Sequence, residues 1–147
     1  MNNSCSIVGF ENLLLATDGS ESAEAATQEA LNIAKVCSGR LHVISVVEVN
    51  PEYGALAPQI VEKAAAETKD QLDFVKNKAE KEGITCDVVA HQGEEPYQFI
   101  IDEARKRKVD MIIMGSHGRT GLKRLMMGSV TSRVIGHAPC KVLVVPC

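Results

Sequence analysis

Five short apolar runs, separated by segments of helical periodicity, restrict the fold of this chain more than any other feature. The runs occupy residues 12–17, 41–49, 84–91, 110–114 and 141–145. Each run is almost continuously apolar, which is typical of parallel strands buried on both faces. Because such strands alternate with helices, we predict an α/β fold: an open, doubly wound five-stranded parallel sheet with helices on both faces.

The segments between the runs carry helical spacing and helix end signals. We expect helices from Ser20 to Ser38-Gly39, over 56–82, over 97–106 after Pro96, and from Ser129 to Gly136, with a loop at 50–54 and a turn at 92–95. The expected apolar face is Ala23, Ala26, Ala30, Ile33, Ala34 and Cys37 on the first helix, and Leu56, Ile60, Ala64, Leu72, Val75 and Ala79 on the second. Ser20 is a typical N-cap, and proline suits a first helical turn.

The length of the chain fits one domain over residues 1–147, because 15.8 kDa is the usual size of a unit with one core. No linker, internal repeat or low-complexity segment divides it. In open parallel sheets, ligands bind outside the carboxyl ends of the strands where the winding reverses. The first strand ends at Asp18 and the fourth at Gly115, so these ends form the binding crevice if the two strands are neighbours.

Composition and charge exclude several classes of function. Only 3% of the residues are aromatic and there is no Trp, which argues against a stacking platform for nucleic acid. No acidic residue follows Asp110, so the last 37 residues carry a charge of +5 on a chain of net charge −3. A local basic segment on an acidic protein suits a small anion better than a long polyanion. The alternative is a chance distribution of solvated loop charges.

Cysteine usage and hydropathy predict a protein of the cytoplasm. The five cysteines are odd in number and include no CxxC pair, which is typical of free thiols in a reducing compartment. No run approaches ~18 apolar residues, so no membrane span is expected. The first ten residues lack the features of a signal peptide.

A glycine-rich loop follows the fourth apolar run and is the strongest candidate site. It reads Gly115-Ser-His-Gly-Arg-Thr-Gly121, with Gly128-Ser129 at the start of the next helix. Glycine allows positive φ and close approach to a ligand. Unpaired N–H groups at a helix start favour phosphate, and the hydroxyls of Ser129 and Thr131 can bind phosphate oxygens. The alternative is a plain surface loop with Ser129 as an N-cap.

The loop differs from the two commonest nucleotide motifs, since it has no GxxxxGK[ST] and the first strand has no GxGxxG after it. Its spacing, Gly115-x2-Gly118-x9-Gly128-Ser129, resembles the ATP-binding signature of universal stress proteins. The similarity extends to residues 13–26, which resemble the family's first strand and turn, and to 110–145, which resemble its C-terminal half.

The resemblance implies a Rossmann-like fold of the adenine-nucleotide alpha-hydrolase kind and a regulatory module of the stress response that binds ATP. It also implies a homodimer through the last strand, while composition and hydropathy predict no nucleic acid or membrane partner. The implied cofactor-binding residues are Ala16, Thr17, Asp18, Val46, Met114, Gly115, His117, Gly118, Arg119, Gly128, Ser129, Val130 and Thr131. Asp18 is the implied ligand of Mg²⁺ or Mn²⁺.

Two other functions stay open at this point. A slow ATPase would use a carboxylate-bound metal and Arg119. Because there is no Walker lysine and no clear general base, we assign no catalytic residue. An interaction protein of the same fold without a nucleotide is disfavoured by the intact glycine spacing. ATP, ADP, AMP and cyclic nucleotides are not distinguished, because the loop recognises phosphate more clearly than base.

Two groups of polar residues are expected to carry no chemistry. His42, His91 and His137 have no partner in the sequence pattern. The basic run at 105–108 is interpreted as a solvated helix end that complements the helix dipole.

Overall fold

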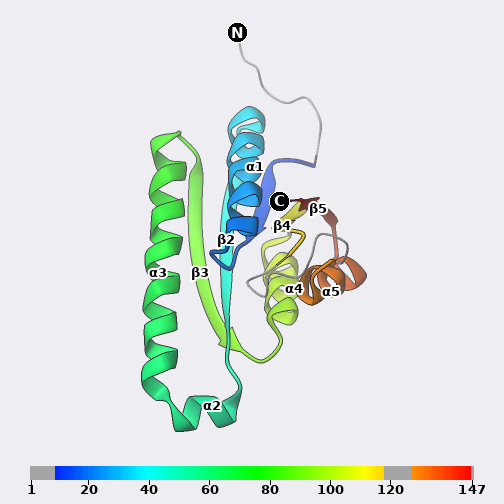
Figure 1. The fold of residues 1–147 in the computed structure, drawn as a ribbon. Helices are drawn as coiled ribbons and strands as arrows, with labels where there is room; N and C mark the ends of the chain where they lie inside the picture. The colour runs from blue at the N-terminus through cyan, green and yellow to red at the C-terminus, as the bar shows by residue number, and fades with distance from the viewer. Residues whose placement is uncertain (1–8, 118–126, 147) are drawn as a thin grey trace.

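The computed structural model describes residues 9–117 and 127–146, which form a five-stranded parallel sheet (Figure 1). The strands are β1 (Asn12–Ala16), β2 (Arg40–Glu48), β3 (Thr85–Gly93), β4 (Met111–Gly115) and β5 (Lys141–Val145). Their order is β3-β2-β1-β4-β5, and every neighbouring pair is parallel. The open parallel sheet expected from the apolar runs is therefore confirmed.

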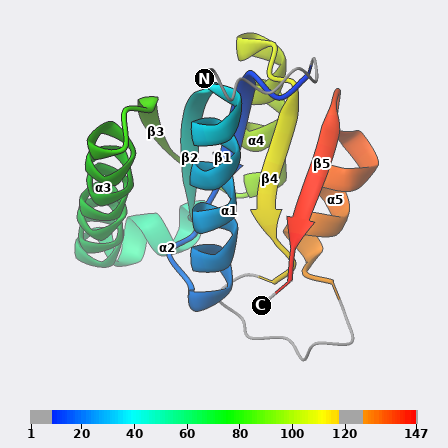
Figure 2. The same ribbon diagram turned by 90° about the horizontal axis from the view of Figure 1, so that it is seen from above.

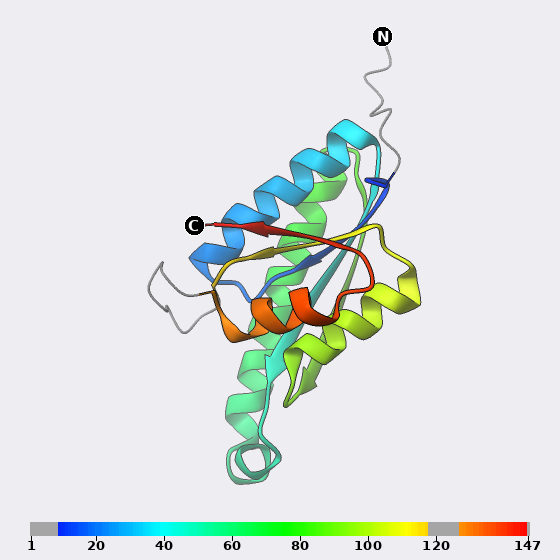
Figure 3. The same cartoon turned by 90° about the vertical axis from the view of Figure 1, so that its right-hand side faces the viewer.

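Helices cover both faces of the sheet (Figures 2 and 3). They are α1 (Glu21–Cys37), α2 (Pro51–Leu56), α3 (Pro58–Lys81), α4 (Pro96–Arg107) and α5 (Ser129–His137). The first core cluster joins the sheet to α1 and α3, and includes Leu13 and Leu15; the second joins it to α4 and α5, and includes Leu14. Successive residues of a strand point to opposite faces, so one apolar run supplies both cores.

The ends of α1 follow from its sequence. Ser20 is the N-cap, and its Oγ accepts a hydrogen bond of 3.2 Å from the N–H of Ala23. At the other end Ser38 adopts the left-handed conformation, with φ 51°, and its N–H bonds to Ala34. The left-handed position thus falls on Ser38 rather than on Gly39. Between these caps, the small side chains of α1 are buried against the sheet.

The region between β2 and β3 differs from the expectation. Residues 51–56 form α2 rather than a loop, and α3 starts separately at Pro58, which lacks the N–H that a continuous helix would need. The expected apolar stripe is wrong at its start, since Leu56 and Ile60 are 84% and 68% exposed. The reason is spatial: α2 lies at one end of the molecule, away from α1, α4 and α5 (Figure 1). The C-terminal half of the stripe is buried as expected.

The strand and turn before α4 also differ slightly. β3 continues to Gly93, past the expected end at His91, because Val49 N–H bonds to Gly93 O at 2.9 Å and keeps the pair together. None of the helices in residues 9–117 and 127–146 is long and apolar enough to cross a membrane.

A polar network joins α4 to β2 and β3, which corrects the interpretation of Arg107, whereas Arg105, Lys106 and Lys108 are exposed at the helix end as expected. Arg107 Nε lies 2.7 Å from Glu103, and its Nη1 lies 2.8 Å from Asp87. Asp87 also contacts His42, which is only 5% exposed, and Glu103 contacts His91 at 3.0 Å. Glu103 and Arg107 are an i, i+4 pair on α4, but Asp87, His42 and His91 come from other elements, so no local pattern indicated those partners. Arg107, His42 and His91 are structural residues of this network.

Candidate functional site

The carboxyl ends of β1 and β4 lie side by side, as the crevice requires. Leu13–Ala16 pair with Met111–Met114. The chain continues from β1 to β2 on one side of this pair and from β4 to β5 on the other, so the winding reverses here. A cavity of about 380 Å³ opens at these ends. This volume is within the usual range for small-molecule sites, roughly 300–1,000 Å³.

The cavity gathers all the described residues that the sequence singled out. They are Ala16, Thr17, Asp18, Val46, Met114, Gly115, His117, Gly128, Ser129, Val130 and Thr131. Gly118 and Arg119 lie outside the described residues. Segments more than a hundred residues apart in the chain thus line one site.

The wall at the end of β1 is held by backbone hydrogen bonds. The N–H of Thr17 bonds to Ile44 O of β2 at 3.0 Å, which extends the sheet by one residue. The next residue, Asp18, lines the cavity, and its Oδ1 accepts a bond of 2.9 Å from the N–H of Ser20. Gly19 has φ +81°, which a side chain would disfavour, and lets the chain turn into α1. Asp18 therefore shapes the turn and faces the site at once.

Gly115 is required by packing rather than by its backbone angle. Its φ is not positive, contrary to the expectation from the loop sequence. A Cβ at this position would lie 3.0 Å from the carbonyl oxygen of Ser22 and 3.1 Å from its Oγ. The start of α1 therefore approaches the end of β4 as closely as a glycine allows.

The start of α5 forms the opposite wall. Gly128 is the N-cap of α5, and its N–H bonds to Ser116 O at 2.9 Å, which holds the start of α5 against the end of β4. The Thr131 hydroxyl donates to Gly115 O at 2.9 Å and is 3% exposed. Its proton is thus already used, so Thr131 ties α5 to β4 instead of donating to a ligand. Ser129 is exposed at the first position of the helix.

Sequence reasoning missed a third wall, which comes from α3 and the start of α4. Ala64, Thr68, Pro96 and Ile100 line the cavity, as do Ser45, Val47 and Glu48 of β2. The signal was present on α3, because residues 64, 68 and 72 follow one another at helical spacing and Thr68 interrupts the apolar stripe. Thr68 is 5% exposed.

The charges around the cavity are divided between its walls. The carboxylates of Asp18 and Glu48 lie at the ends of β1 and β2, and the positive end of the α5 dipole lies across from β1. Within the described part of the chain, no group of three or more His, Cys, Asp or Glu side chains forms a metal site. One carboxylate suits Mg²⁺ only together with ligand phosphates and water.

One model of a known protein family matches almost the whole chain. The model described as "Universal stress protein family" matches residues 9–146. The chain belongs to the universal stress protein family. A universal stress protein of Methanocaldococcus jannaschii, MJ0531, is 38% identical over 92% of this chain and 82% of its own length.

Solved structures of the universal stress protein fold superpose closely on this one. Hypothetical protein MJ0577 has a TM-score of 0.87 at 30% identity, covering 95% of this chain and 98% of that one. The universal stress protein UspA from Lactobacillus plantarum has a TM-score of 0.82 at 28% identity, covering 92% and 97%.

Two more distant universal stress proteins were solved with adenine nucleotides. One is a complex with cAMP, with a TM-score of 0.70 and 20% identity over 92% of this chain and 96% of that one. The other, from Archaeoglobus fulgidus, is a complex with dAMP, with a TM-score of 0.67 and 21% identity over 91% and 96%. At 20% and 21% sequence identity, these two similarities show that the fold is shared.

Proposed function

We propose that this universal stress protein binds an adenine nucleotide, ATP, in the cavity at the carboxyl ends of β1, β2 and β4. The observation that carries the proposal is that one cavity is walled by the turn after β1, the end of β2 and the glycine-flanked start of α5. The structural neighbours with cAMP and dAMP support the adenine nucleotide class. Binding would make the protein a regulatory module of the stress response, one domain over residues 1–147.

The phosphates belong at the α5 wall in this proposal. The N-terminus of a helix offers N–H groups and a positive dipole to an anion, and Ser129 adds an exposed hydroxyl. Gly115 and His117 line the same side, and Gly118 and Arg119 follow in sequence. The two loop residues are proposed contacts from the family signature alone.

The adenine belongs between β2 and the start of α4. Val46 and Ile100 give this part of the cavity apolar surface, while Ser45 and Thr68 add hydroxyl groups. Such a lining, apolar with a few polar groups, is typical of small-molecule sites.

Asp18 fits a role as a metal ligand. Its carboxylate lines the cavity beside the walls proposed for the nucleotide, and Mg²⁺ or Mn²⁺ is usually held by one or two carboxylates plus the phosphates of a nucleotide. The ion would offset the repulsion between Asp18 and the phosphates.

We also propose that two copies pair through β5. It is an edge strand, and its last four residues are half-buried and apolar. An apolar edge strand is a ready template for another strand. The cytoplasm is the proposed location, because the odd number of cysteines and the lack of a CxxC pair in the sequence are typical of a reducing compartment.

The first test is to purify the protein without added nucleotide, denature it and identify any released small molecule by mass spectrometry. ATP in stoichiometric amount would support the proposal and identify the nucleotide. Nothing released, followed by no calorimetric binding of ATP with Mg²⁺, would refute it.

A matched pair of variants tests the position of the site. Ala64→Phe places a ring in the cavity, so we expect ATP to bind at least tenfold more weakly, about 1.4 kcal/mol, in isothermal titration calorimetry. Ala66→Phe makes the same change at an exposed position of α3 outside the cavity, and should bind as the wild type does. Equal affinity in both folded variants would place the nucleotide elsewhere.

A further inference from the structure

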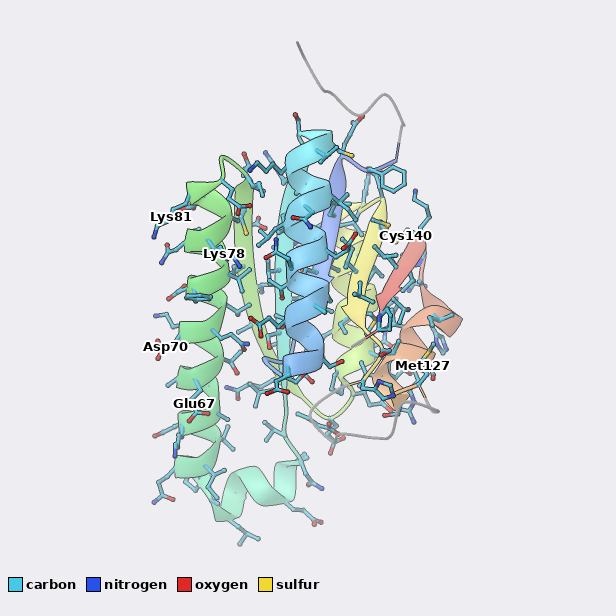
Figure 4. The ribbon with its side chains drawn as sticks, turned by 45° about the horizontal axis from the view of Figure 1, so that its top comes forward. Glu67, Asp70, Lys78, Lys81, Met127 and Cys140 are labelled. Carbon is cyan, nitrogen blue, oxygen red and sulfur yellow. The ribbon has the colours of Figure 1, made fainter. Side chains whose placement is uncertain are left out.

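The outer side of α3 carries an exposed stripe of two acids, one aromatic ring and two lysines. The spacings between Glu67, Asp70, Phe74, Lys78 and Lys81 are three or four residues, which places all five along one side of the helix. All are exposed, and Phe74 is 68% exposed. Figure 4 labels the four charged residues along α3. We call these five residues the α3 stripe.

The core side of α3 is separate from this stripe. Its buried residues are Thr68, Leu72, Val75 and Ala79, which pack toward the sheet. At 100° per residue, Phe74 points more than a quarter turn away from them. The α3 stripe therefore contributes little to the core and is accessible to another molecule.

The charges of the stripe are arranged symmetrically about Phe74. The acids lie seven and four residues before the ring, and the lysines lie four and seven residues after it. If two α3 helices pack antiparallel with Phe74 on a two-fold axis, Glu67 faces Lys81 and Asp70 faces Lys78. Along the helix, the Asp70–Lys78 pair lies about 6 Å from the two-fold axis and the Glu67–Lys81 pair about 10.5 Å from it. Every charge of the stripe then meets its opposite.

We propose that α3 is a self-association surface, on which a second copy of this chain packs its own α3 antiparallel. A two-fold contact uses the same patch on both copies, so the patch must be complementary to itself. A uniformly acidic or basic partner would attract one half of the stripe and repel the other. The symmetric order of charges thus favours a second copy over any other partner.

The ring and the charges have different roles in this contact. Exposed ion pairs contribute at most about 1 kcal/mol each, whereas a central aromatic side chain shielded by a polar rim is a typical anchor of an interface. Phe74 therefore supplies the attraction, and the charges select the antiparallel register. In a single copy, Lys78 Nζ bonds to Gln28 of α1 at 3.2 Å, so the Lys78 side chain must exchange this bond for the pair with Asp70 when the second copy packs (Figure 4).

The α3 contact is independent of the proposed pairing through β5. α3 packs beside β3 at one edge of the sheet, and β5 forms the other edge (Figure 2). Both contacts can form at once, so the assembly grows beyond a dimer when both are present. Loss of one contact leaves the other intact.

Charge reversal in the full-length protein tests the proposal by sedimentation velocity at low salt. Glu67→Lys/Asp70→Lys makes the stripe entirely basic, and Lys78→Glu/Lys81→Glu makes it entirely acidic. We expect the weight-average mass of each variant alone to be about half that of the wild type. An equal mixture of the two variants should have the wild-type mass, because every facing pair of charges between them is attractive. The chain that carries all four changes should also have the wild-type mass, for the same reason.

The control keeps the charge change but moves it off the stripe. Glu62→Lys/Asp73→Lys reverses two other exposed acids of α3, rotated about 120° and about 100° from Phe74, and should associate as the wild type does. Circular dichroism verifies that each variant is folded. The proposal is overturned if the wild type and both stripe variants have the same mass, or if the mixture is no heavier than its components.

Discussion

At the scale of single residues, the close packing of α1 on the end of β4 depends on Gly115. We expect Gly115→Ala to lower the free energy of unfolding by about 1–3 kcal/mol, because its Cβ would press on the carbonyl oxygen of Ser22 at 3.0 Å. That oxygen belongs to the first turn of α1, so it cannot move alone. Urea unfolding measures the effect.

A second glycine gives the comparison. Gly136 lies in α5, and a Cβ added there would have no neighbouring atom within 4 Å, so Gly136→Ala should stabilise the protein by about 0.5–1 kcal/mol through its helix propensity. A Gly115→Ala protein as stable as the wild type would mean that α1 shifts freely, and the packing argument would be wrong.

At the scale of elements, Arg107 fastens α4 to the sheet through Asp87 of β3, and it also binds Glu103 one turn earlier on α4. Partial burial raises the pKa of Asp87 and of Glu103, but hydrogen bonds outweigh burial and hold both pKa values below their ordinary range. The hydrogen bonds to Asp87 come from His42 and Arg107. Those to Glu103 come from Arg107 and His91. A carboxylate with a lowered pKa in the folded state stabilises the protein above its unfolded pKa, about 4. That stability is lost as the pH falls through the folded pKa.

We therefore expect the melting temperature to be nearly constant from pH 7 to 5 and to fall below about pH 4. Arg107→Met leaves Glu103, with a side chain only 8% exposed, without its cation, at a cost of about 1–3 kcal/mol at pH 7. The difference in the free energy of unfolding between Arg107→Met and the wild type should become smaller as the pH falls below about 4. Arg105→Met, exposed on the same helix, is the control. A pH-independent gap would show that Arg107 acts by packing alone.

The helices also show where local patterns mislead. Leu56 and Ile60 both lie in helices, but in two different ones, since Leu56 ends α2 and Ile60 lies in α3. Their exposure shows that periodicity predicts a helix but not the presence of a core beside it. In contrast, the periodic face of α1 is buried because β1 and β4 lie beneath it.

At the scale of the whole molecule, the proposed assembly of copies depends on the two edges of the sheet. Val145 O accepts a bond from Ser116 N–H, so Val145 points its polar groups toward β4. Successive residues of a strand alternate, so Val144 directs its N–H outward from the sheet. We expect Val144→Pro to abolish pairing through β5, halving the mass measured by light scattering, because proline removes a donor that an incoming strand needs.

The fold should survive this change, since edge strands tolerate proline where the N–H is not bonded within the sheet. Circular dichroism provides the check. A folded Val144→Pro protein with the wild-type mass would exclude pairing through β5, while leaving the α3 contact to its own test.

The sequence alone determined the strands, most helix ends and the family. Continuous apolar runs need burial on both faces, caps such as Ser20 act within four residues, and the glycine spacing around 115–129 is local to one loop. The tertiary structure decided the strand order, the cavity wall from Thr68, the contact of Gly115 with Ser22 and the bond of Arg107 to Asp87. The physical reason is the same for all four. Each depends on which distant segments meet. The periodicity of a strand or helix predicts the face on which a side chain lies, but it does not predict which segment packs against that face.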